Sequence, residues 1–168
     1  METTPVLDSS PEFDPRALRD AFGQFASGIT VVSLLDGDGR PTGVTVSSFS
    51  SLSLEPALCL FSLGKSQMSC KWIDSGNGFN INILSAEQEA SAWQFAKPLE
   101  DKFDGVEWYA GRNALPVLKG SLCHFECAKW NVYDGGDHII VVGQITHFER
   151  GDGDPLLFYR GKMATVAE

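Results

Sequence analysis

A hydroxyl-rich run at residues 45–56 begins inside one predicted strand, 43–49, and leads into a second, 57–63. Its first nine residues carry six Ser or Thr hydroxyls. Polar groups beside buried strands are costly unless they find hydrogen-bond partners. The run therefore indicates a site for a ligand with several hydrogen-bonding edges, such as a planar heterocycle. The alternative is a strand edge whose hydroxyls are solvated.

Strands dominate the rest of the chain. Alternating or β-rich patterns predict five more of them, at 29–35, 79–83, 121–132, 138–148 and 155–160. Turn signals at 36–39 and 133–137 join neighbouring strands into hairpins. The strands do not alternate regularly with helices, so a parallel sheet is not supported. Long antiparallel strands favour a closed barrel, which removes exposed edges.

Three short helices are predicted, at 15–27, 66–74 and 86–96. Asp14 is typical of an N-cap, and Ser85 and Gln88 have the spacing of a capping box. Gly28 is expected to end the first helix. The residues expected to face the core are Leu18, Phe22 and Phe25 in the first helix, Met68, Trp72 and Ile73 in the second, and Ala86, Ala90 and Trp93 in the third.

The 168 residues predict one domain at 14–168, preceded by a flexible arm at 1–13. A formal charge of −9 argues against nucleic-acid binding, which needs a basic face. No segment approaches the ~20 apolar residues of a membrane helix. The acidic N-terminus lacks the apolar run of a signal peptide, so a cytoplasmic location is expected.

Four cysteines form no CxxC pair, which favours reduced, buried thiols over metal or redox use. The histidines His124, His138 and His147 lie too far apart in sequence for a local metal motif, so no metal site is expected. No GxGxxG, Walker A or GxSxG motif is present.

Four segments occur in the order typical of the flavin reductase domain family: Gly43–Pro56, Phe79–Leu84, Gly136–His138 followed by Gly143, and Pro155–Gly161. The chain from about residue 14 to 162 resembles this family of short-chain NAD(P)H:flavin oxidoreductases. The resemblance implies a mainly β, split-barrel (Greek-key) FMN-binding fold with a few short helices. It also implies a homodimer.

The same resemblance implies a set of flavin-binding residues. Hydrogen bonds to the ring would come from Thr45, Val46 (through its backbone), Ser47 and Ser48. The phosphate would be held by Ser62, Lys65 and Ser66, or by Lys102, which precedes Phe103. Asn82 and Tyr159 complete the implied set. For both lysines the alternative is an ordinary solvated side chain.

His138 matches the family's histidine at the border of the flavin and nicotinamide sites, where it would orient the nicotinamide carboxamide. The alternative is a histidine at a strand start that bonds to Asp137 or to the backbone. Tyr159 and Arg160 are expected to close the same pocket or to serve a subunit interface.

The resemblance thus predicts an enzyme in which NADH or NADPH reduces FMN or FAD by hydride transfer. Reduced flavin would then pass to a separate oxygenase partner. One alternative is a non-catalytic flavin-binding protein or electron carrier of the same fold. Another is a barrel that binds a different heterocycle.

Overall fold

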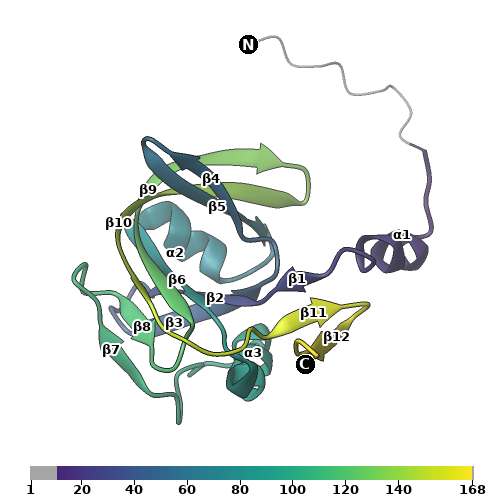
Figure 1. The fold of residues 1–168 in the computed structure, drawn as a ribbon. Helices are drawn as coiled ribbons and strands as arrows, with labels where there is room; N and C mark the ends of the chain where they lie inside the picture. The colour runs from purple at the N-terminus through teal and green to yellow at the C-terminus, as the bar shows by residue number, and fades with distance from the viewer. Residues whose placement is uncertain (1–10, 168) are drawn as a thin grey trace.

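The longest elements are two neighbouring strands, β9 (Cys123–Gly135) and β10 (His138–Arg150), which form a hairpin (Figure 1). The structure is a computed structural model and describes residues 11–167, so most of the arm predicted at 1–13 lies outside the described residues. Gly136 has φ 81°, a left-handed conformation that glycine adopts readily, and the chain reverses there. The predicted hairpin is confirmed, with three of its strand ends shifted by two or three residues.

These two strands lie inside a seven-stranded antiparallel sheet of order β3-β2-β6-β9-β10-β5-β4. The other members are β2 (Thr30–Leu35), β3 (Pro41–Val46), β4 (Ser50–Leu54), β5 (Ala57–Gly64) and β6 (Gly78–Ile83). The sheet curves strongly (Figure 1).

Its edge strands, β3 and β4, are consecutive in the chain, and residues 47–49 connect them. The hydroxyl-rich run therefore crosses the opening between the two sheet edges. Within residues 11–167 no hydrogen-bonded ladder joins β3 to β4. The mainly β fold is confirmed, but the closed barrel expected from strand patterning is not formed.

The inside of the curved sheet holds the main hydrophobic core, in which Phe61 and Phe79 pack edge to face with ring centroids 5.2 Å apart. The helix α2 (Ser69–Ser75) adds Ile73, which is buried as predicted. Met68 is exposed, against expectation, because α2 begins at Ser69 and Met68 precedes its first turn. Trp72 is only partly buried and packs over the turn at Gly37.

A second core cluster lies under the helix α3 (Glu89–Ala96). The predicted capping box at Ser85 is confirmed, but it opens a short 3-10 turn, η1 (Ala86–Gln88), before α3 starts. Helical phase therefore restarts at Glu89, and Ala92 and Phe95 face the core instead of the predicted stripe. Trp93 of that stripe is exposed.

The N-terminal helix α1 (Pro15–Phe22) stands beside the sheet and buries none of its residues (Figure 1). Asp14 caps it as predicted, accepting the backbone N–H groups of its first turn. The helix ends at Gly23 rather than at Gly28. Phe22 and Phe25, expected in the core, are 71% and 83% exposed.

Two small sheets complete the fold. β1 (Ser27–Gly28) pairs with β11 (Leu157–Tyr159), which pairs with β12 (Lys162–Ala164), while β7 (Trp108–Ala110) pairs with β8 (Pro116–Leu118). All four cysteines are free. Among the described helices, none combines the length and apolar character needed to cross a membrane.

Candidate functional site

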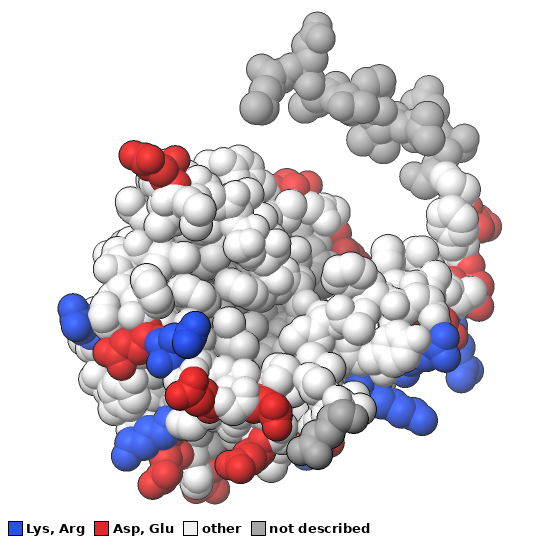
Figure 2. Space-filling model, viewed as in Figure 1, with Lys and Arg blue, Asp and Glu red and all other residues white. Residues whose placement is uncertain are grey.

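Two cavities meet at Ser47, at the opening between the sheet edges. The smaller, about 260 Å³, is lined by Thr45, Val46, Ser47, Ser48, Ser62 and His138, among others. The larger, about 810 Å³, lies between α1 and β11 and is lined by Arg19, Phe22, Phe25, Phe158 and Arg160 in addition to Ser47. In the view of Figure 2, charged side chains lie mostly around the periphery, and the centre of the face is largely uncharged.

The hydroxyl-rich run supplies one wall of the smaller cavity. The four serines between residues 47 and 51 are exposed, so the flanking strands do not enclose them. Two hydroxyls already stabilise the wall: Thr45 Oγ1 donates to the Ala92 carbonyl at 2.6 Å, and Ser48 Oγ bonds to the backbone of Ser62. The wall is therefore held in shape by its own side chains. The predicted residues 45–48 and Ser62 are indeed brought together.

His138 faces this wall from the first position of β10, opposite Gly64 of β5. Its Nδ1 lies 2.6 Å from an Asp137 carboxylate oxygen, and this hydrogen bond holds the pKa of Asp137 below its ordinary value. The bond to Asp137 foreseen as an alternative is thus present. Nε2 points toward Gly64 at the cavity, since a Cβ on that glycine would lie 3.7 Å from it. A histidine held through Nδ1 keeps Nε2 available for a ligand.

Lys65 and Ser66 follow directly after the cavity-lining end of β5. Lys65 forms an ion pair with Asp134 of β9, and its backbone N–H donates to the Asp137 carbonyl at 3.0 Å. Both contacts tie the end of β5 to the turn that carries His138. Lys65 is therefore a neighbour of the cavity whose ammonium is engaged within the protein.

Lys102 and Phe103 lie apart from the two cavities that meet at Ser47. The Lys102 ammonium donates to the Phe95 carbonyl at 3.0 Å, and burial lowers its pKa. Phe103 is buried and packs edge to face against Phe95, 4.9 Å between centroids. Both side chains thus brace the end of α3.

Asn82 is fully buried in β6, away from the cavities. Its amide group donates to the Val31 carbonyl and to Ser33 Oγ, and its oxygen accepts the Leu118 N–H. These bonds join β2, β6 and β8. In this structure Asn82 stabilises the scaffold beneath the site.

The C-terminal segment closes the larger cavity against α1. The Arg160 guanidinium donates to Gln24 Oε1 from Nε and Nη2, at 3.1 and 2.9 Å, and lies 5.0 Å above the Tyr159 ring. Arg19 adds a second cation to the lining. The sequence offered Arg160 as a pocket residue but did not indicate Arg19, Phe22 or Phe25. The sequence did not identify them because apolar residues at helical spacing are expected to pack on the core, whereas α1 buries none of its residues.

Comparison with known proteins places this geometry in a family. The model of the flavin reductase like domain matches residues 22–167. A "Probable flavin reductase" of Rhizobium meliloti (strain 1021) is 44% identical over 153 residues, which are 91% of this chain and 49% of that protein. The chain thus spans about half the length of that relative.

Two further relatives are matched over most of their length. The reductase subunit HsaB of a flavin-dependent monooxygenase from Rhodococcus jostii (strain RHA1) is 40% identical, covering 91% of this chain and 78% of that protein. The NADH:FAD oxidoreductase SgcE6 of Streptomyces globisporus C-1027, solved in complex with NAD and FAD fragments, superposes with a TM-score of 0.87. It is 34% identical, and the match covers 94% of this chain and 98% of that one. From the matched domain, the sequence identities and the shared fold, the chain belongs to the flavin reductase like domain family.

Proposed function

We propose that the protein uses NADH or NADPH to reduce FMN or FAD by hydride transfer and delivers reduced flavin to a separate oxygenase. One observation carries the proposal: His138 and the run at 45–48, far apart in sequence, line a single cavity, and a larger cavity shares Ser47 in its lining. Relatives named as monooxygenase reductase subunits support the same activity.

The smaller cavity suits the edge of a flavin ring. A bound flavin would supply the atom that accepts hydride. Backbone N–H groups around Val46 and Ser47, with nearby hydroxyls, would donate hydrogen bonds to the ring's acceptor edge. Such fixed donors favour negative charge where reduction creates it. The Thr45 and Ser48 bonds hold these donors in position before any ligand arrives.

His138 would position the second ring. With Nδ1 held by Asp137, its Nε2 can bond to the nicotinamide carboxamide. Hydride transfer requires the reacting atoms ~3–3.5 Å apart and does not require a strong acid or base. In this proposal His138 orients the donor and transfers no proton.

The phosphates need cations. Ser62, Lys65 and Ser66 lie at or beside the smaller cavity and are the better supported ligands for the flavin phosphate. The ammonium groups of both lysines are bonded within the protein, Lys65 to Asp134 and Lys102 to the Phe95 carbonyl, and Lys102 is the second candidate because it lies apart from both cavities. Arg19 and Arg160 would serve the pyrophosphate of a dinucleotide in the larger cavity, with Tyr159 stacked beneath Arg160.

The proposal also includes a homodimer, an oxygenase partner and a cytoplasmic location. The exposed Phe22 and Phe25 beside the larger cavity support a homodimer that covers α1. Four free cysteines support a reducing, cytoplasmic location. An oxygenase partner is supported by the relatives that are named as reductase components of flavin-dependent monooxygenases.

The test is a stopped-flow survey of the four pairs made from NADH or NADPH and FMN or FAD. We expect flavin-dependent oxidation of the nicotinamide with at least one pair and none without flavin. Flavin binding without nicotinamide oxidation by any pair would instead support the electron-carrier alternative. If no flavin binds, both proposals fail.

A further inference from the structure

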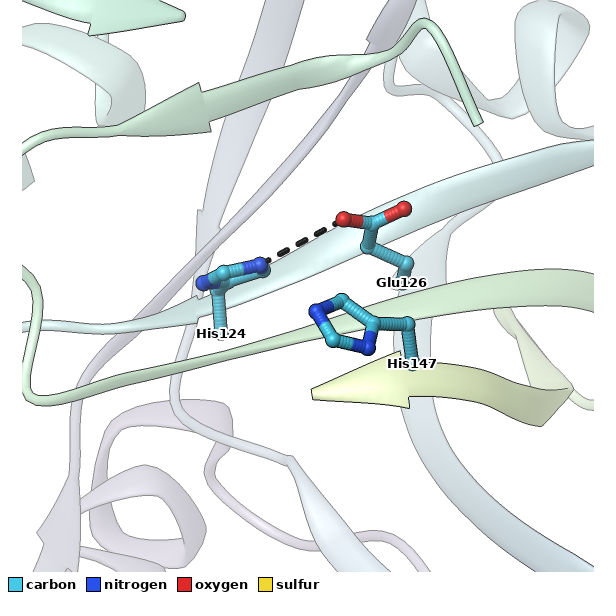
Figure 3. Close-up of side chains that lie close together, drawn as sticks. All are labelled: His124, Glu126 and His147. Carbon is cyan, nitrogen blue, oxygen red and sulfur yellow. Dashed lines mark ion pairs between the residues drawn. The ribbon is translucent and has the colours of Figure 1, made fainter. Parts of the chain in front are cut away.

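A cluster of the buried His124 and Glu126 with the partly buried His147 lies at the opposite end of the β9–β10 hairpin from His138 (Figure 3). One ligand atom from each side chain can be chosen so that all lie within 4.8 Å of one another. Glu126 is paired with His147 across the two strands, and a register shift between Ile145 and His147 sets this pairing. Histidines separated by more than twenty residues in sequence are thereby brought to one face of the hairpin.

The glutamate of the cluster is held rigidly and is 2% exposed. Its Oε1 accepts the Arg112 N–H at 3.1 Å, and its Oε2 accepts the Asn113 N–H at 3.0 Å. Gly111 allows this approach, since a Cβ there would lie 2.8 Å from Oε1. Among the ion pairs of residues 11–167, its partner is His124 alone. A buried carboxylate requires a compensating positive charge, which a protonated histidine or a cation can provide.

The side chain of His124 is 6% exposed, and its Nε2 has no hydrogen-bond partner within the described structure. This atom points toward Glu126, 3.5 Å from Oε1. Buried polar atoms are almost always satisfied, so an unpaired one calls for an explanation. Two ligands bound at about 2.1 Å to a tetrahedral zinc ion lie about 3.4 Å apart, close to the separation observed here.

We propose that His124, Glu126 and His147 bind one divalent transition-metal ion of the Zn²⁺ class. Two imidazole nitrogens and one carboxylate oxygen suit Zn²⁺ better than the oxygen-seeking Mg²⁺ or Ca²⁺. The ion would satisfy His124 Nε2, balance the Glu126 charge and link β9 to β10. A cavity of about 260 Å³, lined by Tyr109 and Ser121 among others, borders the cluster at His124.

The site is separate from the proposed flavin site. His124 pairs with Glu149 near one end of the hairpin, whereas His138 pairs with Gly135 at the other. The ion would therefore stabilise the far end of the hairpin and take no part in hydride transfer. Its presence can be tested without any measurement of flavin reduction.

The test is titration of the chelator-treated full chain with Zn²⁺, followed by calorimetry, and with Co²⁺, followed by visible absorption. We expect one ion per chain, no displacement by Mg²⁺, and cobalt bands typical of nitrogen and oxygen ligands. His147→Gln and His124→Gln should each weaken Zn²⁺ binding by more than about 100-fold, since changes outside the ligand shell alone cost about 10–100-fold. His138→Gln, at the other end of the hairpin, should leave Zn²⁺ affinity unchanged.

Three results would overturn the proposal: no stoichiometric Zn²⁺ on the wild-type chain, unchanged affinity in His147→Gln, or an intense thiolate-to-cobalt band, which would assign the ion to cysteines. The side chain of His147 is 19% exposed, so its replacement disturbs the core less than that of His124. If His124→Gln does not fold by circular dichroism, His147→Gln and the wild-type titrations decide the matter. If the wild-type chain binds no stoichiometric Zn²⁺, a protonated histidine, hydrogen-bonded within the cluster, would explain how the Glu126 carboxylate is balanced.

Discussion

Ser48 and Ser62 exchange two hydrogen bonds across the opening of the curved sheet. Ser48 Oγ accepts the Ser62 N–H at 2.9 Å and donates to the Ser62 carbonyl at 3.0 Å. One hydroxyl thus satisfies both backbone groups of a residue on β5. The hydroxyl-rich run has a structural task at the same place where we propose that it binds a ligand.

Ser48→Ala should lower the free energy of unfolding by about 1 kcal/mol. Each lost bond is worth ~0.5–1.5 kcal/mol, and water partly replaces both bonds at this exposed site. Ser50→Ala is the matched control, because Ser50 Oγ bonds only to the neighbouring Ser51 carbonyl and should change stability by less than about 0.5 kcal/mol. Urea unfolding of the three proteins measures the difference. Equal losses in the two variants would deny Ser48 this role.

His138→Gln should raise the KM for the nicotinamide roughly 3–10-fold, the equivalent of one lost hydrogen bond of ~0.5–1.5 kcal/mol. Flavin affinity should be nearly retained, since the run at 45–48 contacts the flavin in our proposal. Steady-state kinetics and flavin titration by fluorescence separate the two effects. Equal losses for both ligands would mark His138 as a structural residue.

Acid titration gives a second test of the His138 turn. The hydrogen bond from His138 lowers the pKa of Asp137, so the stabilisation is present above the ordinary aspartate pKa and is lost as pH falls through the lowered one. Carbon-detected NMR should find the Asp137 pKa below its usual range in the wild type and closer to that range in His138→Gln. Asp134 is the internal control, because Lys65 lowers its pKa and should do so in both proteins. An Asp137 titration unchanged by the substitution would exclude the pair in solution.

Features specified by nearby residues were predictable from the sequence. The strand around Phe79, the hairpin turn at Gly136 and the cap at Asp14 each depend on a few consecutive residues, and each is confirmed. Which side of a helix faces inward was less predictable, because a single 3-10 turn before α3 changed the phase and buried Phe95 instead of Trp93.

The candidate site was predictable only in part. Resemblance to the family indicated residues 45–48 and His138, and the structure brings them to one cavity. No local pattern shows that Lys102 bonds to the Phe95 carbonyl, since that contact depends on how α3 ends. The approach of His124 to His147 likewise depends on the register of a long hairpin, which strand alternation does not determine.

The two lysines predicted for the flavin phosphate can now be distinguished by experiment. Lys65→Ala should weaken flavin affinity by ~1–3 kcal/mol, the scale of a charge-assisted hydrogen bond. Lys102→Ala is the comparison: it should lower stability through the lost bond to Phe95 and change flavin affinity less. Flavin titration and thermal unfolding of both variants provide the readouts. A larger affinity loss in Lys102→Ala would reassign the phosphate to Lys102.

Arg160→Ala should loosen α1 and weaken nicotinamide binding together. The substitution removes both hydrogen bonds to Gln24 and the contact with Tyr159, which connect the C-terminal segment to the chain that follows α1. If the guanidinium also contacts the dinucleotide pyrophosphate, the KM should rise roughly tenfold, equivalent to about 1.4 kcal/mol. Hydrogen exchange of the α1 amides and steady-state kinetics measure the two effects.

Arg40→Ala is the control for this prediction, because its ion pairs with Asp36 and Asp38 lie in an exposed turn away from both cavities at Ser47. It should alter neither exchange in α1 nor the KM. Faster exchange with an unchanged KM in Arg160→Ala would limit Arg160 to bracing the wall. A raised KM with unchanged exchange would mean that the guanidinium acts on the ligand directly, and α1 would then be held by other contacts.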